Sequence, residues 1–310
     1  MQKFSSLLLM PLALFVSGCA TAETTPETHI LDPDWTFQDD FEAAPDKSFW
    51  QPARQVFFNS SCAGGTRSGS GTLRYDYLPN YGTANDPGVS EVGDSWAETK
   101  FILPIKATQI QISYDLYIPP DYVAAKRNHK GLMLWSGKYG VINSNITVHH
   151  SLWGTTASAK GGATPGFNIG MDGKNFGHAM RSDKALLWEN HSGKWQRMHH
   201  YVELAERPGD FGRADIWRNG ELIHSTHSAE IRPAYTGAPA PSESIRYASR
   251  GNYIDKGYLL GWANDLNNTE LMSFCIENFT IKANKIVGAT TTSVPSAIVQ
   301  PRPPASVRID

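Results

Sequence analysis

The sequence predicts an all-β protein, folded as a β-jelly-roll sandwich of two antiparallel sheets. Short runs of alternating apolar and polar residues recur along the chain, separated by Gly, Pro, Asn and Asp, as in strands joined by turns. No window longer than about a dozen residues keeps a helical period. The expected strands are residues 71–78, 97–104, 110–119, 130–137, 144–153, 165–171, 185–190, 194–204, 214–223, 257–262 and 271–283.

Residues 1–18 are predicted to be a signal peptide. Lys3 precedes an apolar run, Leu7 to Val16, that is too short for a permanent membrane helix. The following VSGC resembles the lipobox of bacterial lipoproteins, which implies that Cys19 is lipidated and becomes the mature N-terminus. Ala20, directly after the cysteine, resembles the residue at this position in lipoproteins that are sorted to the outer membrane. We therefore expect a lipid-anchored protein of the outer membrane that faces the periplasm or the cell surface. The alternative is a plain signal peptide with an unmodified cysteine.

The rest of the chain divides into a tether, one domain and a tail. Residues 19–32 are polar and read as a flexible tether. Residues 33–286 suit one large β-domain. Residues 287–310 are rich in Thr, Ser and Pro and lack the apolar residues that a core needs, which predicts disorder.

The net charge limits the classes of binding partner, and the cysteine content raises the question of a disulfide. The formal net charge is −2 and the basic residues are scattered, so we expect no nucleic-acid partner. We also expect the protein to be monomeric. Once Cys19 is lipidated, Cys62 and Cys275 remain. In an oxidising compartment they either form a disulfide or stay as two buried thiols, and both alternatives are open.

Two local patterns are specific. Asn219-Gly220 between strand-like runs predicts a hairpin with a two-residue turn. In KWQRMHHYVEL, residues 194–204, alternate side chains of a strand point to opposite faces. Met198, His200, Val202 and Leu204 then face the core, so His200 is expected to be buried and hydrogen-bonded. The opposite face receives Arg197, His199, Tyr201 and Glu203.

This polar strand is the predicted centre of a polysaccharide-binding groove. Indole rings stack on sugars, and Lys or Arg pairs with uronic carboxylates. Patterns for zinc, nucleotide or serine-hydrolase sites, such as HExxH, GxGxxG and GxSxG, are absent from the sequence. The candidate substrate-binding residues, drawn from several strands, are Trp135, Lys138, Tyr139, His150, Glu203 and Trp217.

The reaction that this set fits best is β-elimination on a uronic-acid polymer. It needs a base for the proton α to the carboxylate, a cation for the enediolate and an acid for the departing oxygen. His199 and Tyr201 are the candidate base and acid, with Arg197 as the cation. Hydrolysis is the weaker option, because the clustered acidic ExDxxE pattern of jelly-roll glucanases is absent.

A family resemblance agrees with this interpretation. SGKWQRMHHYVELAERPGDFGRADIWRNGELI, KGLMLWSGKYG and YLLGWANDLNNTELMSFCIENFTIKA resemble segments of the jelly-roll alginate and glucuronan lyases, polysaccharide lyase families 14 and 20. DDFEAAPDKSFW resembles the opening strand of concanavalin A-like sandwiches. The resemblance implies a jelly-roll fold and lyase activity on an acidic polysaccharide. It departs at His199 and His200, where the family often carries Gln or Glu.

Two other functions and one ion remain as alternatives. The protein could be a non-catalytic carbohydrate-binding surface lipoprotein, which needs only aromatic platforms. It could also be a structural lipoprotein whose groove is filled by its own loops. No cofactor and no catalytic metal are expected. Asp265, Asn267 and Glu270 carry the hard oxygen ligands of a structural calcium site, although the EF-hand spacing is absent.

Overall fold

A computed structural model of the chain describes part of its length. The described residues are 29–30, 32–51, 53–69, 71–79, 93–122, 128–136, 145–151, 164–171, 174–178, 191–204, 213–225, 253–264, 266 and 268–285. The predicted signal peptide with Cys19, the predicted tail, Lys138 and Tyr139 lie outside these residues. None of the described segments is a helix long and apolar enough to cross a membrane.

The described residues form 15 strands, and every pairing between them is antiparallel. The all-β jelly-roll prediction is therefore confirmed. The strands are β1 Trp35–Asp39, β2 Val56–Ser60, β3 Thr72–Tyr77, β4 Ser95–Trp96, β5 Thr99–Tyr117, β6 Asn128–Trp135, β7 Asn145–Ser151, β8 Thr164–Met171, β9 Lys174–His178, β10 Trp195–Glu203, β11 Arg213–Arg218, β12 Glu221–Ser225, β13 Ile254–Leu259, β14 Trp262–Asn264 and β15 Met272–Lys285.

Two expected strands prove to be one. The predicted strands 97–104 and 110–119 fall within the single strand β5, which runs without interruption past Pro104. Its pairing with β13 shifts register between Ile254 and Lys256, opposite the stretch that contains Pro104. A bulge of this kind accommodates a residue that has no N–H to donate. The expected strand 185–190 lies outside the described residues.

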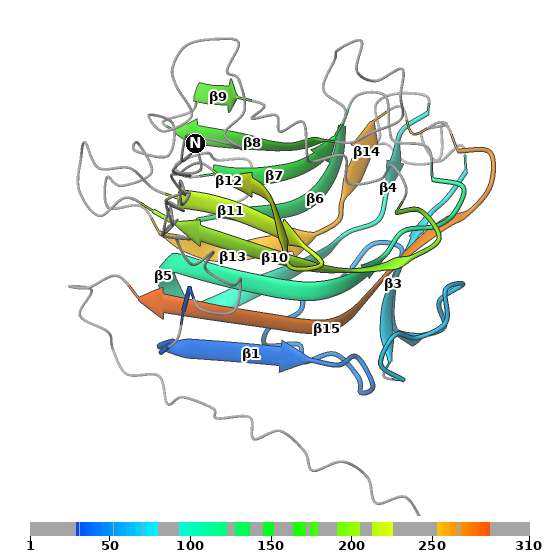
Figure 1. Ribbon diagram of the computed structural model, residues 1–310, viewed down its shortest axis with the longest axis horizontal. Helices are drawn as coiled ribbons and strands as arrows, with labels where there is room; N and C mark the ends of the chain where they lie inside the picture. Colours follow the sequence, from blue (N-terminus) through cyan, green and yellow to red (C-terminus); the bar gives the residue numbers. More distant parts are fainter. Residues whose placement is uncertain are drawn as a thin grey trace, which may run out of the picture.

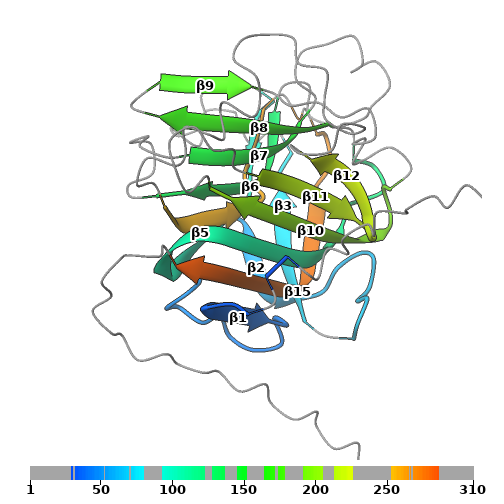
Figure 2. The same ribbon diagram turned by 60° about the vertical axis from the view of Figure 1, so that its left-hand side comes forward.

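The strands are arranged in two layers. Hydrogen-bonded strands follow one another in the continuous order β12-β11-β10-β5-β13-β6-β7-β8-β9, with β15 also beside β5 and β1 beside β15. We divide this path at β5 into the β10 sheet, with β1, β15, β5, β10, β11 and β12, and the β6 sheet, with β13, β6, β7, β8 and β9. They share β5, because residues 109–117 pair with β10 and β15, whereas residues 99–107 pair with β13. In Figure 1 strands β10–β12 lie in front of β13, β6 and β7, and in the turned view of Figure 2 strands β9, β8, β7 and β6 lie above β5, β15 and β1.

The main core lies between these layers. Leu132 and Leu134 from β6 and Met198 and Val202 from β10 belong to one buried cluster. Ile110, Ile112, Tyr114 and Leu116 of β5 join it at alternate positions. Each sheet consequently turns its other face away from the core.

The predicted hairpin is present. β11 and β12 pair antiparallel with Arg218 opposite Glu221, and Asn219 and Gly220 both have positive φ. A two-residue turn of this type matches the twist of the strands that it joins. On its other edge β11 pairs with β10, where Trp217 lies opposite His199.

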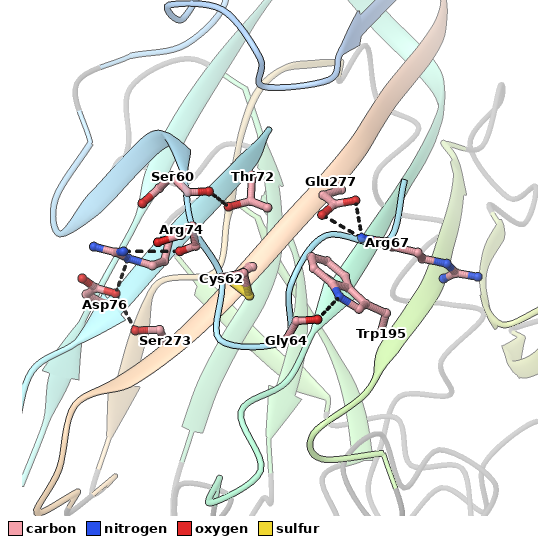
Figure 3. Close-up of a disulfide and its surroundings, with 12 residues drawn as sticks. Ser60, Cys62, Gly64, Arg67, Thr72, Arg74, Asp76, Trp195, Ser273 and Glu277 are labelled. Carbon is pink, nitrogen blue, oxygen red and sulfur yellow. Dashed lines mark hydrogen bonds and ion pairs between the residues drawn. A yellow bond between two sulfur atoms is a disulfide. The ribbon is translucent and has the colours of Figure 1, made fainter. Parts of the chain in front are cut away.

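A disulfide joins Cys62 to Cys275, so the structure selects the paired alternative (Figure 3). Cys62 precedes β3 in a loop and Cys275 lies in β15. The same loop is held on the β10 sheet by polar contacts. Trp195 Nε1 donates to Gly64 O at 3.3 Å, and the backbone N–H groups of Arg67 and Ser68 donate to the Glu277 carboxylate.

We expect the Cys62→Ala/Cys275→Ala variant to lose about 2–5 kcal/mol of unfolding free energy, because the bond closes a long loop of the unfolded chain. Urea denaturation of the oxidised protein measures the loss. Reductant should lower the stability of the wild type to that of the variant and leave the variant unchanged. Equal midpoints for the oxidised wild type and the variant would contradict this expectation.

Candidate functional site

The polar face predicted for β10 forms on the side of the β10 sheet that turns away from the core. Met198, Val202 and Leu204 are in the core cluster, so alternation along β10 is as predicted. Neighbouring strands add polar residues in register with it. We call this surface the polar face; its described members include Arg197, His199, Tyr201 and Glu203 of β10, Gln111, Ser113 and Asp115 of β5, Asp215 and Trp217 of β11, and Glu277, Thr280 and Lys282 of β15.

His199 lies in the middle of the polar face and is only 5% exposed. Its ring centroid is 5.2 Å from that of Trp217, in an edge-on arrangement. Nε2 of His199 is buried and has no hydrogen-bond partner among the described residues. Burial, together with smaller contributions from the nearby His29, Arg197 and Lys282, lowers the pKa of His199 from 6.5 to about 3. The imidazole is therefore neutral at physiological pH.

The pKa of Tyr201 is shifted in the opposite direction to that of His199. Burial raises the pKa of its phenol above the ordinary value of 10, and the hydrogen bond donated to Glu203 Oε2 at 2.7 Å adds to the shift. The phenol is therefore protonated at neutral pH. Two neighbouring groups whose surroundings drive their pKa values apart are the usual composition of an acid–base pair.

Charged groups cluster at one end of the polar face, around Asp115. Arg67 Nη1 lies 2.8 Å from Asp115 Oδ1, and Arg197 Nη1 lies 3.6 Å from Oδ2. Asn278 Nδ2 donates to the same Oδ2 at 2.7 Å. The Asp115 side chain is 6% exposed, whereas those of Arg67 and Arg197 are 43% and 39% exposed. The cations therefore face solvent and the carboxylate lies beneath them.

Residues that precede β1 cover the middle of the polar face. The side chain of His29 lies against Tyr201 and Trp217, with ring-centroid separations of 4.4 and 4.9 Å. Ile30 packs in a small buried cluster with the same two aromatic side chains, separate from the main core. The expected tether thus makes defined contacts at residues 29 and 30, which the composition of residues 19–32 does not predict.

His200 points into the core, as predicted. Its Nε2 lies 3.1 Å from the hydroxyl oxygen of Tyr114, and the two rings are stacked with centroids 5.6 Å apart. The neighbouring histidines therefore have different surroundings. His200 is part of the packed interior, and only His199 belongs to the polar face.

The expectation that Trp135 lines the same groove is wrong. Leu132 and Leu134 of β6 face the core, so Trp135 points out of the other side of the β6 sheet, where it packs with Met133 and Tyr258. The core therefore separates Trp135 from His199. His150 belongs to β7, in that same sheet, and its side chain lies outside the described ones.

The structure brings Arg67, Asp115, Lys282 and His29 to the site, although sequence reasoning did not select them. The sequence could have identified Asp115, because it alternates with apolar residues in IQISYDLY. Lys282 likewise alternates with Ile281 and Ala283 of β15, which are in the core. The position of Arg67 depends on the disulfide-bonded loop, and that of His29 on the fold of the chain before β1. Neither gives a local signal.

No metal centre emerges from the described residues. They contain no group of three or more His, Cys, Asp or Glu side chains placed to hold a metal ion. The calcium alternative falls largely outside them, because Asp265 and Asn267 are not described. Glu270 is exposed in the turn before β15.

Comparison with known proteins finds similarity in structure alone. No family model and no curated protein sequence matches the chain. An alginate lyase from a Chlorella virus is 14% identical at a TM-score of 0.42, over 74% of this chain and 92% of its own. A variant of the alginate lyase Aly36B bound to alginate trisaccharide is 13% identical at a TM-score of 0.48, over 81% and 98%. The endo-β-1,4-glucuronan lyase of the fungus Trichoderma reesei is 10% identical at 0.44, over 82% and 96%.

The low pKa of His199 predicts a loss of stability in acid. Between pH 6.5 and about 3 the unfolded chain binds a proton at His199 that the folded protein does not bind. The unfolding free energy therefore decreases as the pH falls through this window, by up to about 1.4 kcal/mol per pH unit. Urea unfolding of the wild type and of His199→Gln between pH 7 and pH 4 measures this contribution.

The unfolding free energy of His199→Gln should decrease less steeply than that of the wild type as the pH falls. His191→Gln is the comparison variant: burial and the nearby Arg218 and Lys194 also lower the pKa of this half-buried histidine, so its removal should give a smaller change of the same sign. Equal slopes for the wild type and His199→Gln would show that this imidazole is not kept neutral by the fold.

Proposed function

We propose that the protein is a lyase that cleaves an acidic polysaccharide by β-elimination on the polar face. The observation that carries the proposal is the row Arg197, His199 and Tyr201, in which a cation, a neutral imidazole and a protonated phenol follow one another along β10. Alternate residues of a strand are about 7 Å apart, so the three groups are close neighbours on one face. The sequence resemblance to jelly-roll lyases points to the same reaction.

Each group has one task in the proposed reaction. His199 Nε2 takes the proton from the carbon α to the uronate carboxylate, and the electron pair of that C–H bond forms the new double bond. The glycosidic C–O bond at the β-carbon breaks, and the Tyr201 hydroxyl gives its proton to the departing oxygen. Arg197 stabilises the negative charge of the intermediate enediolate.

The charge distribution supports an anionic polymer as the substrate. Arg67 and Arg197 are exposed, while Asp115 and Glu277 are buried beneath them. Lys282 adds a third, partly exposed cation on the neighbouring strand β15. Guanidinium groups bind carboxylates through paired hydrogen bonds, which suits a chain of uronic acids.

Elimination is tested through the ultraviolet absorbance of unsaturated uronic products. The domain without its lipid is mixed with alginate, glucuronan, pectate and glycosaminoglycans, and we expect the absorbance to rise with one of them. His199→Ala should reduce that rate by about 10²–10⁴-fold, because the base is lost. Leu271→Ala, at an exposed position just before β15, is the control and should retain the rate.

The same assay separates the two parts of the proposal. Product formation that survives in His199→Ala would reject the site and retain the reaction. Failure of every polymer in the panel to give the unsaturated product would reject the reaction itself.

One observation favours a second function, non-catalytic binding of an acidic glycan. The Tyr201 hydroxyl already donates to Glu203, so its proton is engaged inside the protein. A binding protein would use Tyr201 and Trp217 as stacking surfaces and would need no proton transfer. Binding of a polymer by isothermal calorimetry, without any product, identifies this function.

We also propose that the protein is anchored in the outer membrane through lipid on Cys19, facing the periplasm or the surface. The VSGC stretch around Cys19 supports this proposal. In bacterial cells Cys19→Ala should abolish incorporation of labelled fatty acid and move the protein from the membrane to the soluble fraction. Equal labelling of wild type and variant would contradict lipidation at this residue.

A further inference from the structure

The small cluster on the polar face has an unusual composition. Tyr201 and Trp217 are almost completely buried although they project away from the core, and Leu222 of β12 packs beside them. Ile30 completes the cluster, and it comes from the segment before β1. Two adjacent aromatic side chains on an outer sheet face form a surface on which a sugar ring can stack.

His29 occupies this surface. Its imidazole contacts both aromatic rings, and its Nε2 lies 3.8 Å from Asp215 Oδ2. The backbone N–H of Ile30 donates to Gln111 Oε1 at 3.1 Å, which fixes the segment across β5. A planar ring with polar nitrogens thus lies against the aromatic pair, and an amide beside it bonds to a polar-face side chain.

The covered groups are incompletely satisfied. His199 Nε2 and Asp215 Oδ1 are both buried without a hydrogen-bond partner among the described residues. Buried polar atoms that lack partners are costly, and a sugar supplies hydroxyl groups that bond to such atoms. A polysaccharide in the place of residues 29 and 30 would therefore gain hydrogen bonds that these residues do not make.

We propose that Tyr201, Trp217 and Leu222 form a recess for one sugar ring of the bound polymer, and that His29 and Ile30 fill this recess until the polymer displaces them. This inference rests on the proposed function, because the ligand is the uronic-acid chain of the proposed reaction. The covering residues exclude ligand from His199 and keep its imidazole out of water. Their release exposes the base and brings its pKa closer to the ordinary value.

The population of the open form then limits binding. A ligand that binds only the open form shows an affinity reduced by the fraction of open molecules. Weakening the contacts of residues 29 and 30 should increase that fraction and so increase apparent affinity.

The test uses the full chain with His29→Gly and Ile30→Gly combined. Asp32→Gly is the matched control, because Asp32 lies in the same segment and is exposed. The first readout is acylation of His199 by diethyl pyrocarbonate, followed by peptide mass. We expect the double variant to react at least about tenfold faster than the wild type, with the control unchanged.

His200 serves as the internal reference, because it faces the core of the same strand and should stay unreactive. If His200 reacts as well, the variant has lost its fold. The milder Gln111→Ala variant, which removes only the acceptor of the Ile30 amide, then takes its place. An unchanged rate at His199 in a folded variant would overturn the covering role of residues 29 and 30.

The second readout is affinity for the uronate oligosaccharide of the polymer that the protein binds, measured by calorimetry. We expect it to rise at least about tenfold in the double variant and to stay constant in Asp32→Gly. Unchanged affinity, or no uronate binding by the double variant, would overturn the sugar recess. Faster acylation and tighter binding without any unsaturated product would retain the recess and reject the lyase function.

Discussion

The structure of the site depends on the pairing of β10 along both of its edges. Nine residues of β10 pair with β5, and residues 198–203 also pair with β11. A slip of one residue on either side would turn Met198 and Val202 out of the core and bury Arg197 in it. The hydrophobic cost of that exchange fixes the register, and the register fixes which side chains share the polar face. Cross-strand partners such as Ser113 and Trp217 follow from the same constraint.

The fixed register also determines how deeply each charged group of the polar face is buried. Carboxylates at Asp115 and Glu277 are buried under guanidinium groups and backbone N–H donors, and the exposed groups above them are cations. His199 receives no such compensation, so its neutral form is the stable one. A buried, unpaired imidazole costs stability, and such costs tend to occur where a protein binds or transforms a ligand. The polar face therefore combines a charged end, in which carboxylates and cations are paired, with a centre in which His199 Nε2 is buried without a hydrogen-bond partner among the described residues.

Local sequence patterns predicted the parts of this arrangement that follow from local rules. Alternation assigned Arg197, His199, Tyr201 and Glu203 to one face and His200 to the core, and Asn219-Gly220 predicted the turn between β11 and β12. The pairing of distant strands has no local signal, so Trp135 was expected in the groove beside β10, whereas it packs with Met133 and Tyr258 on the outer face of the β6 sheet. Arg67 reaches the site through a loop that the Cys62–Cys275 bond holds. The polar composition around His29 predicted a tether and gave no sign of its contacts with Tyr201.

The most direct test of the central claim, that the polar face binds the polysaccharide, is a map of the ligand on the two outer faces of the sandwich. Nuclear magnetic resonance of the labelled domain, titrated with a defined uronate oligosaccharide, reports the shift of each residue. We expect the shifts to concentrate at Arg197, His199, Tyr201 and Trp217. Shifts concentrated at Trp135 and Tyr258, on the outer face of the β6 sheet, would contradict it and move the site to the opposite side of the core.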